Sequence, residues 1–239
     1  GTGERRKGIV FAVGQFQQET HSSQKIVKEK MSEQNFYNNA YRIETDRLVV
    51  RCYHPSDAQT LADSVAENVE HLKPWMPWVY SEPEPFEVKV DRLKRFRGEF
   101  DLGEDFIYGI FNKEETRLLG GTGLHTRIGE EQLEIDYWIH KDFINQGLTT
   151  ESTAALIKVA FEMIHVHRVE IHCDPGNLAS AAIPRKLGFT HEGTLRAKTR
   201  FLDGWSDSMV WALLDIEYPN SPSCKANIKA FDPLGNPLL

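Results

Sequence analysis

A turn in front of a predicted helix contains the first residues whose types and spacing could do chemistry. Residues 145–150, Asn-Gln-Gly-Leu-Thr-Thr, join a strand-like run to a helical one. The first N–H groups of a helix lack partners within the helix and lie at the positive end of its dipole, so they can bind a phosphate or pyrophosphate. Gly147 would let such a group approach the backbone closely. The alternative is an ordinary loop in which Thr149 or Thr150 caps the helix.

A second segment, residues 174–189, places an amide and a hydroxyl at the start of a short predicted helix. Asn177 and Ser180 lie three positions apart, and Gly188 follows the helix as a natural C-terminal cap. The Ser180 hydroxyl could act as an acid or as the N-cap of this helix, and both roles stay open. Nucleotide-binding loops of other classes are excluded. The GxxxxGK[ST] pattern is absent, and Gly121-Thr122-Gly123 lacks a third glycine and leads into a strand.

Two hydrophobic periods alternate along residues 41–218 and predict the elements that position these segments. A period of two marks strands at residues 48–51, 106–111, 118–126, 133–140, 169–173, 190–195 and 209–214. Helical spacing marks residues 61–69, 88–100, 150–164 and 180–187. The order predicts a mixed α/β domain in which an antiparallel meander leads into a β-α-β-α unit.

Asn177, Ser180 and the Leu-Gly-Phe run at residues 187–189 resemble the strand-loop-helix pattern of the GCN5-related N-acetyltransferase (GNAT) superfamily. Residues 45–51, 72–78 and 134–139 resemble further elements of its RimJ/RimL-like branch of ribosomal-protein N-acetyltransferases. The resemblance covers about residues 41–219. It implies an α/β (α+β) GNAT fold, with a mixed central sheet, an antiparallel meander and a splayed parallel strand pair, flanked by helices.

The resemblance also implies acetyl-CoA as co-substrate, bound in a V between the strands at residues 133–140 and 169–173. Its pantetheine arm would pair with one strand and with Asn177, and its pyrophosphate would lie on the amides of the glycine turn. The residues so implied are Trp138, Ile139, His140, Asn145, Gln146, Gly147, Leu148, Thr149, Thr150 and Asn177. Ile144 and Thr149 depart from the family's turn sequence. Because backbone N–H groups do most of the anion binding, we expect weaker but not absent affinity.

The implied reaction is direct attack of a neutral amine on the thioester in a ternary complex, which requires a base, an oxyanion donor and an acid. Ser180 stands at the family's position for the acid. Arg200 replaces the carboxylate that serves as base in RimL, so we predict Glu134 as the base, with a surface carboxylate as the alternative role. His125 and Asp207 are weaker candidates.

The acceptor is predicted from the chemistry of amines. An α-amine with a pKa of about 7.7–8.0 is partly neutral at pH 7, whereas a lysine amine near 10.4 is not. A weak base therefore favours a protein N-terminus over lysine, and a small-molecule amine also remains open. Trp75 and Trp78 could wall the acceptor cleft and attract an amine by cation–π interaction, or form the core of their own loop.

No metal is expected, because the chain has no CxxC or HxxxH pair. Four residues could be considered as metal ligands, but their spacing is that of a helix end and a strand, which favours scattered surface and core positions: His165, His167, His172 and Cys173. The three cysteines of the chain form no disulfide framework, which favours a reducing compartment and a cytoplasmic location.

The composition places the 239-residue chain among ordinary globular proteins, with 40% hydrophobic and 26% charged residues. Its net charge of −7 offers no global positive field for nucleic acid or an anionic membrane. That charge suits a cationic acceptor but opposes a polyanionic CoA, so CoA binding would rest on local amides and basic side chains. No apolar run approaches the roughly 20 residues of a membrane span. The protein itself is expected as a monomer or homodimer.

Residues 41–219 are predicted to form the GNAT domain. Residues 1–40 are polar apart from a short apolar run that is too brief for a signal peptide, and they are an N-terminal extension or an upstream segment. Residues 220–239 are expected to form a C-terminal tail that packs as an irregular strap. The alternative to an enzyme is a non-catalytic module that binds acetyl-CoA or CoA, which Ile144, Thr149 and Arg200 motivate. A third possibility is a domain of this shape that no longer binds CoA.

Overall fold

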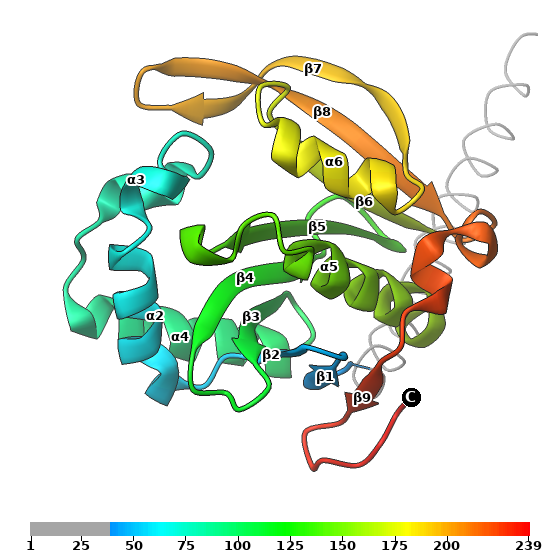
Figure 1. Cartoon of the computed structure of the whole chain (residues 1–239), viewed down its shortest axis with the longest axis horizontal. Helices are drawn as coiled ribbons and strands as arrows, with labels where there is room; N and C mark the ends of the chain where they lie inside the picture. Colours follow the sequence, from blue (N-terminus) through cyan, green and yellow to red (C-terminus); the bar gives the residue numbers. More distant parts are fainter. Residues whose placement is uncertain (1–38) are drawn as a thin grey trace, which may run out of the picture. The chain divides into compact units, whose positions relative to one another are not determined.

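A mixed β-sheet forms the centre of the molecule in the computed structural model, which describes residues 39–239 (Figure 1). Within those residues the sheet has nine strands in the order β7-β8-β6-β5-β4-β3-β2-β1-β9. Only β5 and β6 run parallel among the described pairs. The strands are β1 (Arg42–Glu44), β2 (Leu48–Cys52), β3 (Phe106–Asn112), β4 (Leu118–His125), β5 (Gln132–Ile139), β6 (Arg168–Cys173), β7 (Thr190–Phe201), β8 (Gly204–Leu214) and β9 (Lys229–Phe231).

Helices cover both faces of this sheet (Figure 1). On one face, α2 (Ala58–Ala66) and α4 (Phe86–Asp101) bury Leu61, Val65 and Leu93 against the apolar side chains of β2, β3 and β4. On the other, α5 (Leu148–Val159) and α6 (Leu178–Lys186) join the larger core cluster. The short α3 (Val69–Leu72) follows α2, and one π-helical turn, Ala160–Ile164, continues α5. The predicted helices are confirmed. None of those in the described residues is long and apolar enough to cross a membrane.

The predicted meander is confirmed as β3, β4 and β5, which pair antiparallel in sequence order. Their boundaries lie within one residue of the expected ones. Phe106, Tyr108 and Ile110 lie in the larger core cluster, while Phe111 belongs to the smaller one. Ile110 and Phe111 point to opposite faces of the sheet, and both are buried because helices cover both faces.

The predicted V is also confirmed. β5 and β6 pair only as far as Ile135 and Ile171. Beyond that point β5 stays paired with β4 up to Ile139, and β6 stays paired with β8 up to Cys173. Each arm is therefore held from its outer side, while the inner sides separate and leave backbone groups of two parallel strands facing an opening.

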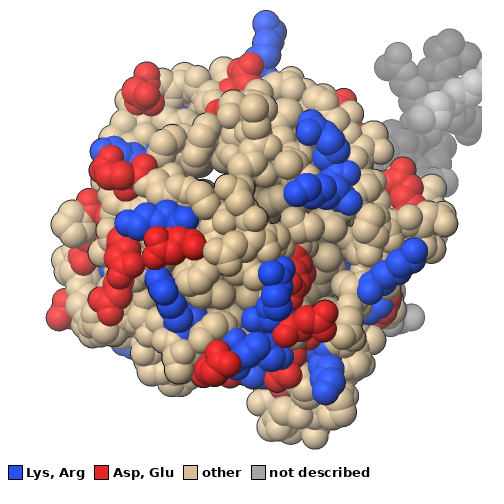
Figure 2. Space-filling view, in the orientation of Figure 1, with Lys and Arg blue, Asp and Glu red and all other residues tan. Residues whose placement is uncertain are grey.

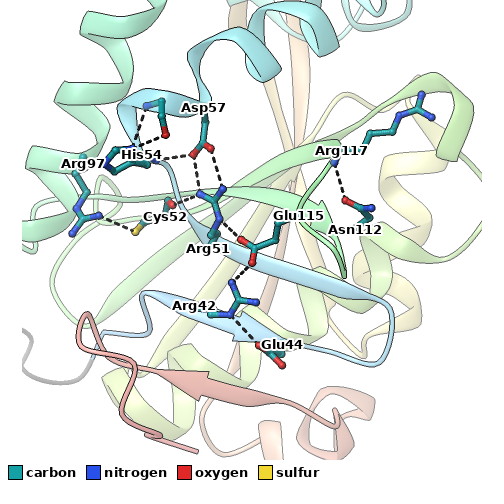
Figure 3. A network of polar contacts seen from close by, with 11 residues as sticks. Arg42, Glu44, Arg51, Cys52, His54, Asp57, Arg97, Asn112, Glu115 and Arg117 are labelled. Atoms are coloured by element: carbon teal, nitrogen blue, oxygen red, sulfur yellow. Dashed lines mark hydrogen bonds and ion pairs between the residues drawn. The ribbon is translucent and has the colours of Figure 1, made fainter.

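An ion-pair network fixes the start of the domain to the meander (Figure 3). Arg51 in β2 binds the carboxylates of Asp57, at 2.8 Å, and Glu115. Glu115 also binds Arg42 of β1, and the Arg51 guanidinium lies 4.1 Å from the centre of the Phe111 ring. Burial opposes the charge of Arg51, but the two carboxylates outweigh it and raise the pKa of this side chain. The network joins β1, β2 and the β3–β4 turn.

The sheet extends beyond the predicted strands in the β7–β8 hairpin and at the C-terminal strand β9. The β7–β8 hairpin is longer than expected because bulges near Gly193 and between Leu195 and Thr199 interrupt its alternation. The prediction of an irregular strap was wrong for Lys229–Phe231, which forms β9 and pairs with β1. The predicted N-terminal segment, residues 1–40, lies outside the described residues except for its last two positions.

Candidate active site

The glycine turn begins α5 without a side-chain cap. Gly147 is the N-cap residue with φ 77°, and Asn145 also has a positive φ of 59°. The Glu151 amide donates to Gly147 O at 3.0 Å, which begins the helical ladder. Neither Thr149 nor Thr150 is the cap, which was the alternative role considered for them. The amides that precede Glu151 belong to residues that line a cavity, and they stand at the positive end of the helix dipole.

Arg47 holds this turn in place, a role that the sequence did not reveal. Its Nη1 donates to Gln146 O at 2.9 Å, and its Nε donates to Glu151 at 2.7 Å. Thr45 also donates its hydroxyl to Glu151 at 2.6 Å. These contacts neutralise a carboxylate in the first turn of α5, which would otherwise repel an anionic ligand.

The opening between β5 and β6 continues into a cavity of about 1090 Å³. Its walls come from both arms of the V, the glycine turn, the start of α6, the loop around Trp75 and the β7–β8 hairpin. This volume lies slightly above the usual range of about 300–1,000 Å³ for small-molecule sites, which suits a large ligand. Predicted site residues that line it are Glu134, Trp138, Ile139, Asn145, Gly147, Leu148, Thr149, Thr150, Asn177 and Ser180.

His140 and Gln146 lie outside this lining. His140 is buried, its Nε2 lies 3.0 Å from a carboxylate oxygen of Glu67, and its Nδ1 accepts from the Asp142 amide. With both ring nitrogens engaged, His140 has a structural role in holding the strand end. The Gln146 side chain instead donates to Asp142 O at 3.0 Å.

Asn177 and Ser180 lie at the start of α6, opposite β5. Asn177 is the N-cap, since its Oδ1 accepts from the Ser180 amide at 3.0 Å. Of the two roles left open for Ser180, that of N-cap is wrong, and its hydroxyl contacts Tyr137 Oη at 3.3 Å instead. Burial raises the pKa of the Tyr137 hydroxyl and that of the nearby Cys173 thiol, so both stay protonated at neutral pH.

Glu134 is a buried, paired carboxylate and not the exposed one that was considered as its alternative role. Arg127 binds both oxygens, with Nε at 2.9 Å and Nη2 at 2.5 Å. His172 Nδ1 lies 3.9 Å from the same carboxylate. The Glu134 side chain is 10% exposed and lines the cavity.

A second carboxylate on β5, Asp136, was missed by the sequence reasoning. It points to the same side of the strand as Glu134, two positions away, and half of its side-chain area is exposed within the cavity. His125 lies between it and Asp105: Nδ1 is 2.8 Å from Asp105 Oδ2, and Nε2 is 3.0 Å from Asp136 Oδ1. The latter contact is an ion pair without the geometry of a hydrogen bond. An acidic residue between Ile135 and Tyr137 in a strand was the signal that could have indicated it.

The remaining candidates take supporting positions. Trp75 and Trp78 line the cavity, and the Trp78 ring packs edge to face against Trp138 with their centres 6.3 Å apart. Arg200 also lines it and lies over the Trp205 ring. Asp207 accepts from the backbone of the facing strand β7. Acidic and basic side chains are interspersed over the face of the molecule seen in Figure 2.

Comparisons with known proteins extend this picture. Residues 47–190 match the family model described as "Acetyltransferase (GNAT) domain". The [ribosomal protein uS5]-alanine N-acetyltransferase of Escherichia coli (strain K12) is 31% identical over 178 residues, which span 72% of this chain and 90% of that protein.

Two solved structures share the fold. RimL, a ribosomal L7/L12 alpha-N-protein acetyltransferase in complex with coenzyme A, aligns with a TM-score of 0.66 at 22% identity, over 71% of this chain and 95% of that one. RimJ of Mycobacterium smegmatis, in complex with CoA-disulfide, aligns with a TM-score of 0.66 at 20% identity, over 79% of this chain and 93% of that one. The predicted resemblance and fold are confirmed.

Proposed function

Because this chain belongs to the GNAT acetyltransferase family and is an acetyl-CoA-dependent N-acetyltransferase, we propose that it acetylates an α-amine at a protein N-terminus. One observation supports use of acetyl-CoA at this site: the V between β5 and β6 opens at Ile135 and Ile171, and the uncapped start of α5 lies on the same cavity. An extended ligand with a pyrophosphate at one end and a reactive group at the other would match both features. A small-molecule amine is the second acceptor class.

The residues present fit acetyl-CoA as co-substrate. The amides of Leu148, Thr149 and Thr150 would receive the pyrophosphate, and the free backbone edge of β5 near Ile139 would pair with the pantetheine arm. Basic side chains on the cavity wall would offset the overall acidity of the protein: Lys186, Lys198 and Arg200. This lining supports binding in spite of Ile144, which stands half-exposed at the cavity without a polar group.

The reaction would place two groups on opposite sides of the thioester. Ser180, hydrogen-bonded to Tyr137, would supply the proton that the leaving thiolate needs. Glu134 would accept the proton of the attacking amine through water, since Arg127 occupies one lone pair of each carboxylate oxygen and two others remain. We propose these two as the catalytic pair.

The acceptor class is suggested by the relatives. The E. coli relative is named for the alanine of ribosomal protein uS5, and RimL is named for the amino end of L7/L12. An α-amine is also the acceptor that needs the weakest base, because a sizeable fraction of it is neutral near pH 7. We therefore propose a peptide that begins with alanine as the first substrate to test, and a cytoplasmic location for the enzyme.

The experiment follows thiol release from acetyl-CoA with three peptides of identical sequence. One has a free N-terminal alanine, one has that amine blocked, and one has a blocked amine and an added lysine. We expect release with the first peptide only. Stoichiometric acetyl-CoA binding without release for any amine would favour the non-catalytic CoA-binding module instead. Absence of acetyl-CoA binding would reject both functions.

A further inference from the structure

The glycines of the Gly121-Thr122-Gly123 run make room for two side chains of the neighbouring strand. In the β4–β5 register Gly121 lies opposite Trp138, and Gly123 lies opposite Asp136. A Cβ atom at Gly121 would lie 2.4 Å from Trp138 Nε1. One at Gly123 would lie 2.6 Å from His125 Nε2 and 3.3 Å from Asp136 Oδ1. Because Gly123 has no side chain, the His125 imidazole can lie over it and contact Asp136.

This arrangement places a negative charge in the cavity. Removal from water alone would lower the pKa of His125, but Asp105 and Asp136 outweigh that effect and raise it to about 10. His125 is therefore a cation at neutral pH. In turn, partial removal from water would raise the pKa of Asp136, but the charges of His125 and Arg127 lower it, so this carboxylate is ionised. Asp105, His125 and Asp136 together carry one net negative charge, while Arg127 and Glu134 neutralise each other.

The carboxylate has room to accept a ligand. His125 contacts Oδ1, and within residues 39–239 nothing donates a hydrogen bond to the other oxygen, Oδ2. Half of the Asp136 side-chain area remains accessible, although His125 beside it is only 7% exposed. Asp136 Oδ2 is therefore available to a ligand in the cavity, beyond the contact that Oδ1 makes with His125.

Asp136 also stands at the apex of the V. The last residue of β5 that pairs with β6 is Ile135, so Asp136 is the first residue beyond the pairing. Trp138 lies on the same face two residues on, and Trp78 packs against its ring. A carboxylate beside aromatic rings is the combination that attracts an alkylammonium group, through charge and through the ring faces.

We propose that Asp136 binds the ammonium group of the acceptor amine at the apex of the V, with His125 and Asp105 as the residues that position its carboxylate. This inference rests on the proposed acetyl transfer but concerns recognition of the acceptor before reaction. It assigns the acceptor class as a cation in the binding step. The bound ammonium group must lose one proton to solvent water before its nitrogen can attack, and Glu134 accepts the second proton, which the nitrogen loses after attack.

The test compares Asp136→Asn, which keeps the shape and removes the charge, with Asp91→Asn, an exposed carboxylate on α4 that contacts Lys94. A second variant, Gly123→Ala, changes no charge but inserts the Cβ that displaces His125 and Asp136. Two quantities are measured: the KM of an alanine-initiated peptide in the thiol assay, and its Kd for the protein saturated with CoA, by calorimetry.

We expect Asp136→Asn to raise both the KM and the Kd of the peptide roughly 10- to 100-fold, the loss of one charge-assisted contact, with Gly123→Ala in the same direction. The Kd of acetyl-CoA should be unchanged in both variants, which shows that they fold, and Asp91→Asn should match the wild type. An unchanged peptide Kd in Asp136→Asn would overturn the inference. So would absence of peptide binding to the wild-type protein.

The two proposals can fail separately. If the wild-type protein binds the peptide in an Asp136-dependent way but releases no thiol, acetyl transfer to this acceptor is rejected and the ammonium site stands. If thiol is released and Asp136→Asn has wild-type KM and Kd, the enzyme stands and the ammonium site is rejected.

Discussion

Tyr137 and Ser180 are joined by two hydrogen bonds that connect β5 to α6. Tyr137 Oη donates to the backbone oxygen of Ser180 at 3.1 Å, and Ser180 Oγ donates to Tyr137 Oη at 3.3 Å. The first bond fixes the position of the tyrosine through the helix backbone and does not depend on the serine side chain. The Ser180 hydroxyl can therefore be removed without releasing Tyr137 from α6.

This relationship gives a direct test of the acid. In Ser180→Ala we expect kcat to fall about 100-fold, the usual contribution of one positioned proton donor, with the Kd of acetyl-CoA unchanged. The measurement is steady-state thiol release together with calorimetric binding. Asn177→Ala is the contrasting variant: loss of its cap and its cavity contact should weaken acetyl-CoA binding and lower stability by about 1 kcal/mol. Wild-type kcat in Ser180→Ala would remove the acid role.

The glycine turn can be tested with a matched pair of substitutions. Gly147 and Gly235 have similar positive φ values, 77° and 82°, but only Gly147 lies at the cavity. Valine in a left-handed conformation costs about 1–2 kcal/mol at either place. Both variants should therefore lose similar stability in chemical denaturation, while Gly147→Val alone should lose acetyl-CoA affinity in calorimetry. Equal affinities for the two variants would reject this turn as the pyrophosphate site.

The network around Arg51 predicts a stability effect away from the cavity. Arg51→Leu would leave Asp57 and part of Glu115 without their partner in a partly buried setting, so we expect a loss of about 3 kcal/mol in the free energy of unfolding. Arg95→Leu, at an exposed site on α4, should change it by less than about 0.5 kcal/mol. Urea denaturation measures both. Similar values for the two variants would show that the network does not stabilise the fold.

The raised pKa of His125 predicts how stability depends on pH. The folded value of about 10 exceeds the unfolded value of about 6.5, so the folded state holds this proton more tightly. Its contribution is fully present below about pH 6.5 and is lost as the pH rises through about 10. The groups that face the ring are Asp105 and Asp136, with Arg127 and Glu134 beside them.

We expect the free energy of unfolding of the wild type to decrease between pH 7 and pH 10 by a few kcal/mol more than that of His125→Gln. Urea denaturation over this pH range measures the difference, and subtraction of the variant removes the contribution of other titrating groups. Parallel curves would contradict the charged state of His125.

The elements of this fold could be predicted where one period of hydrophobicity runs without interruption. The V followed from the resemblance, whereas β3 and β4, which are buried at nearly every position, followed from the polar turns that bound them. The condition of a single period holds in α5. It fails in the β7–β8 hairpin, where bulges reset the alternation, and in the three residues of β9, which carry too little pattern to predict a strand.

Part of the candidate site could likewise be predicted from the sequence, and part could not. The glycine turn, Asn177 and Ser180 are local motifs, so their neighbours in sequence are also their neighbours in space. The contact between His125 and Asp136 depends on the register of β4 and β5 and on the absence of a side chain at Gly123. Neither is visible in a hydrophobic pattern, because a shift of one residue would turn Asp136 to the other face.

The way in which β5 and β6 separate also affects the tendency of the protein to aggregate. An unpaired strand edge usually invites the strand of another molecule and leads to aggregation. Here the free edges belong to strands whose other sides are fully paired, and they face each other inside the sheet. The gap between the separated ends of β5 and β6 is too narrow for a strand of a neighbouring protein, whereas the extended arm of a small ligand can enter it. The unpaired backbone groups of this edge can therefore hydrogen-bond to a small ligand, but they cannot pair with a strand from another copy of the protein.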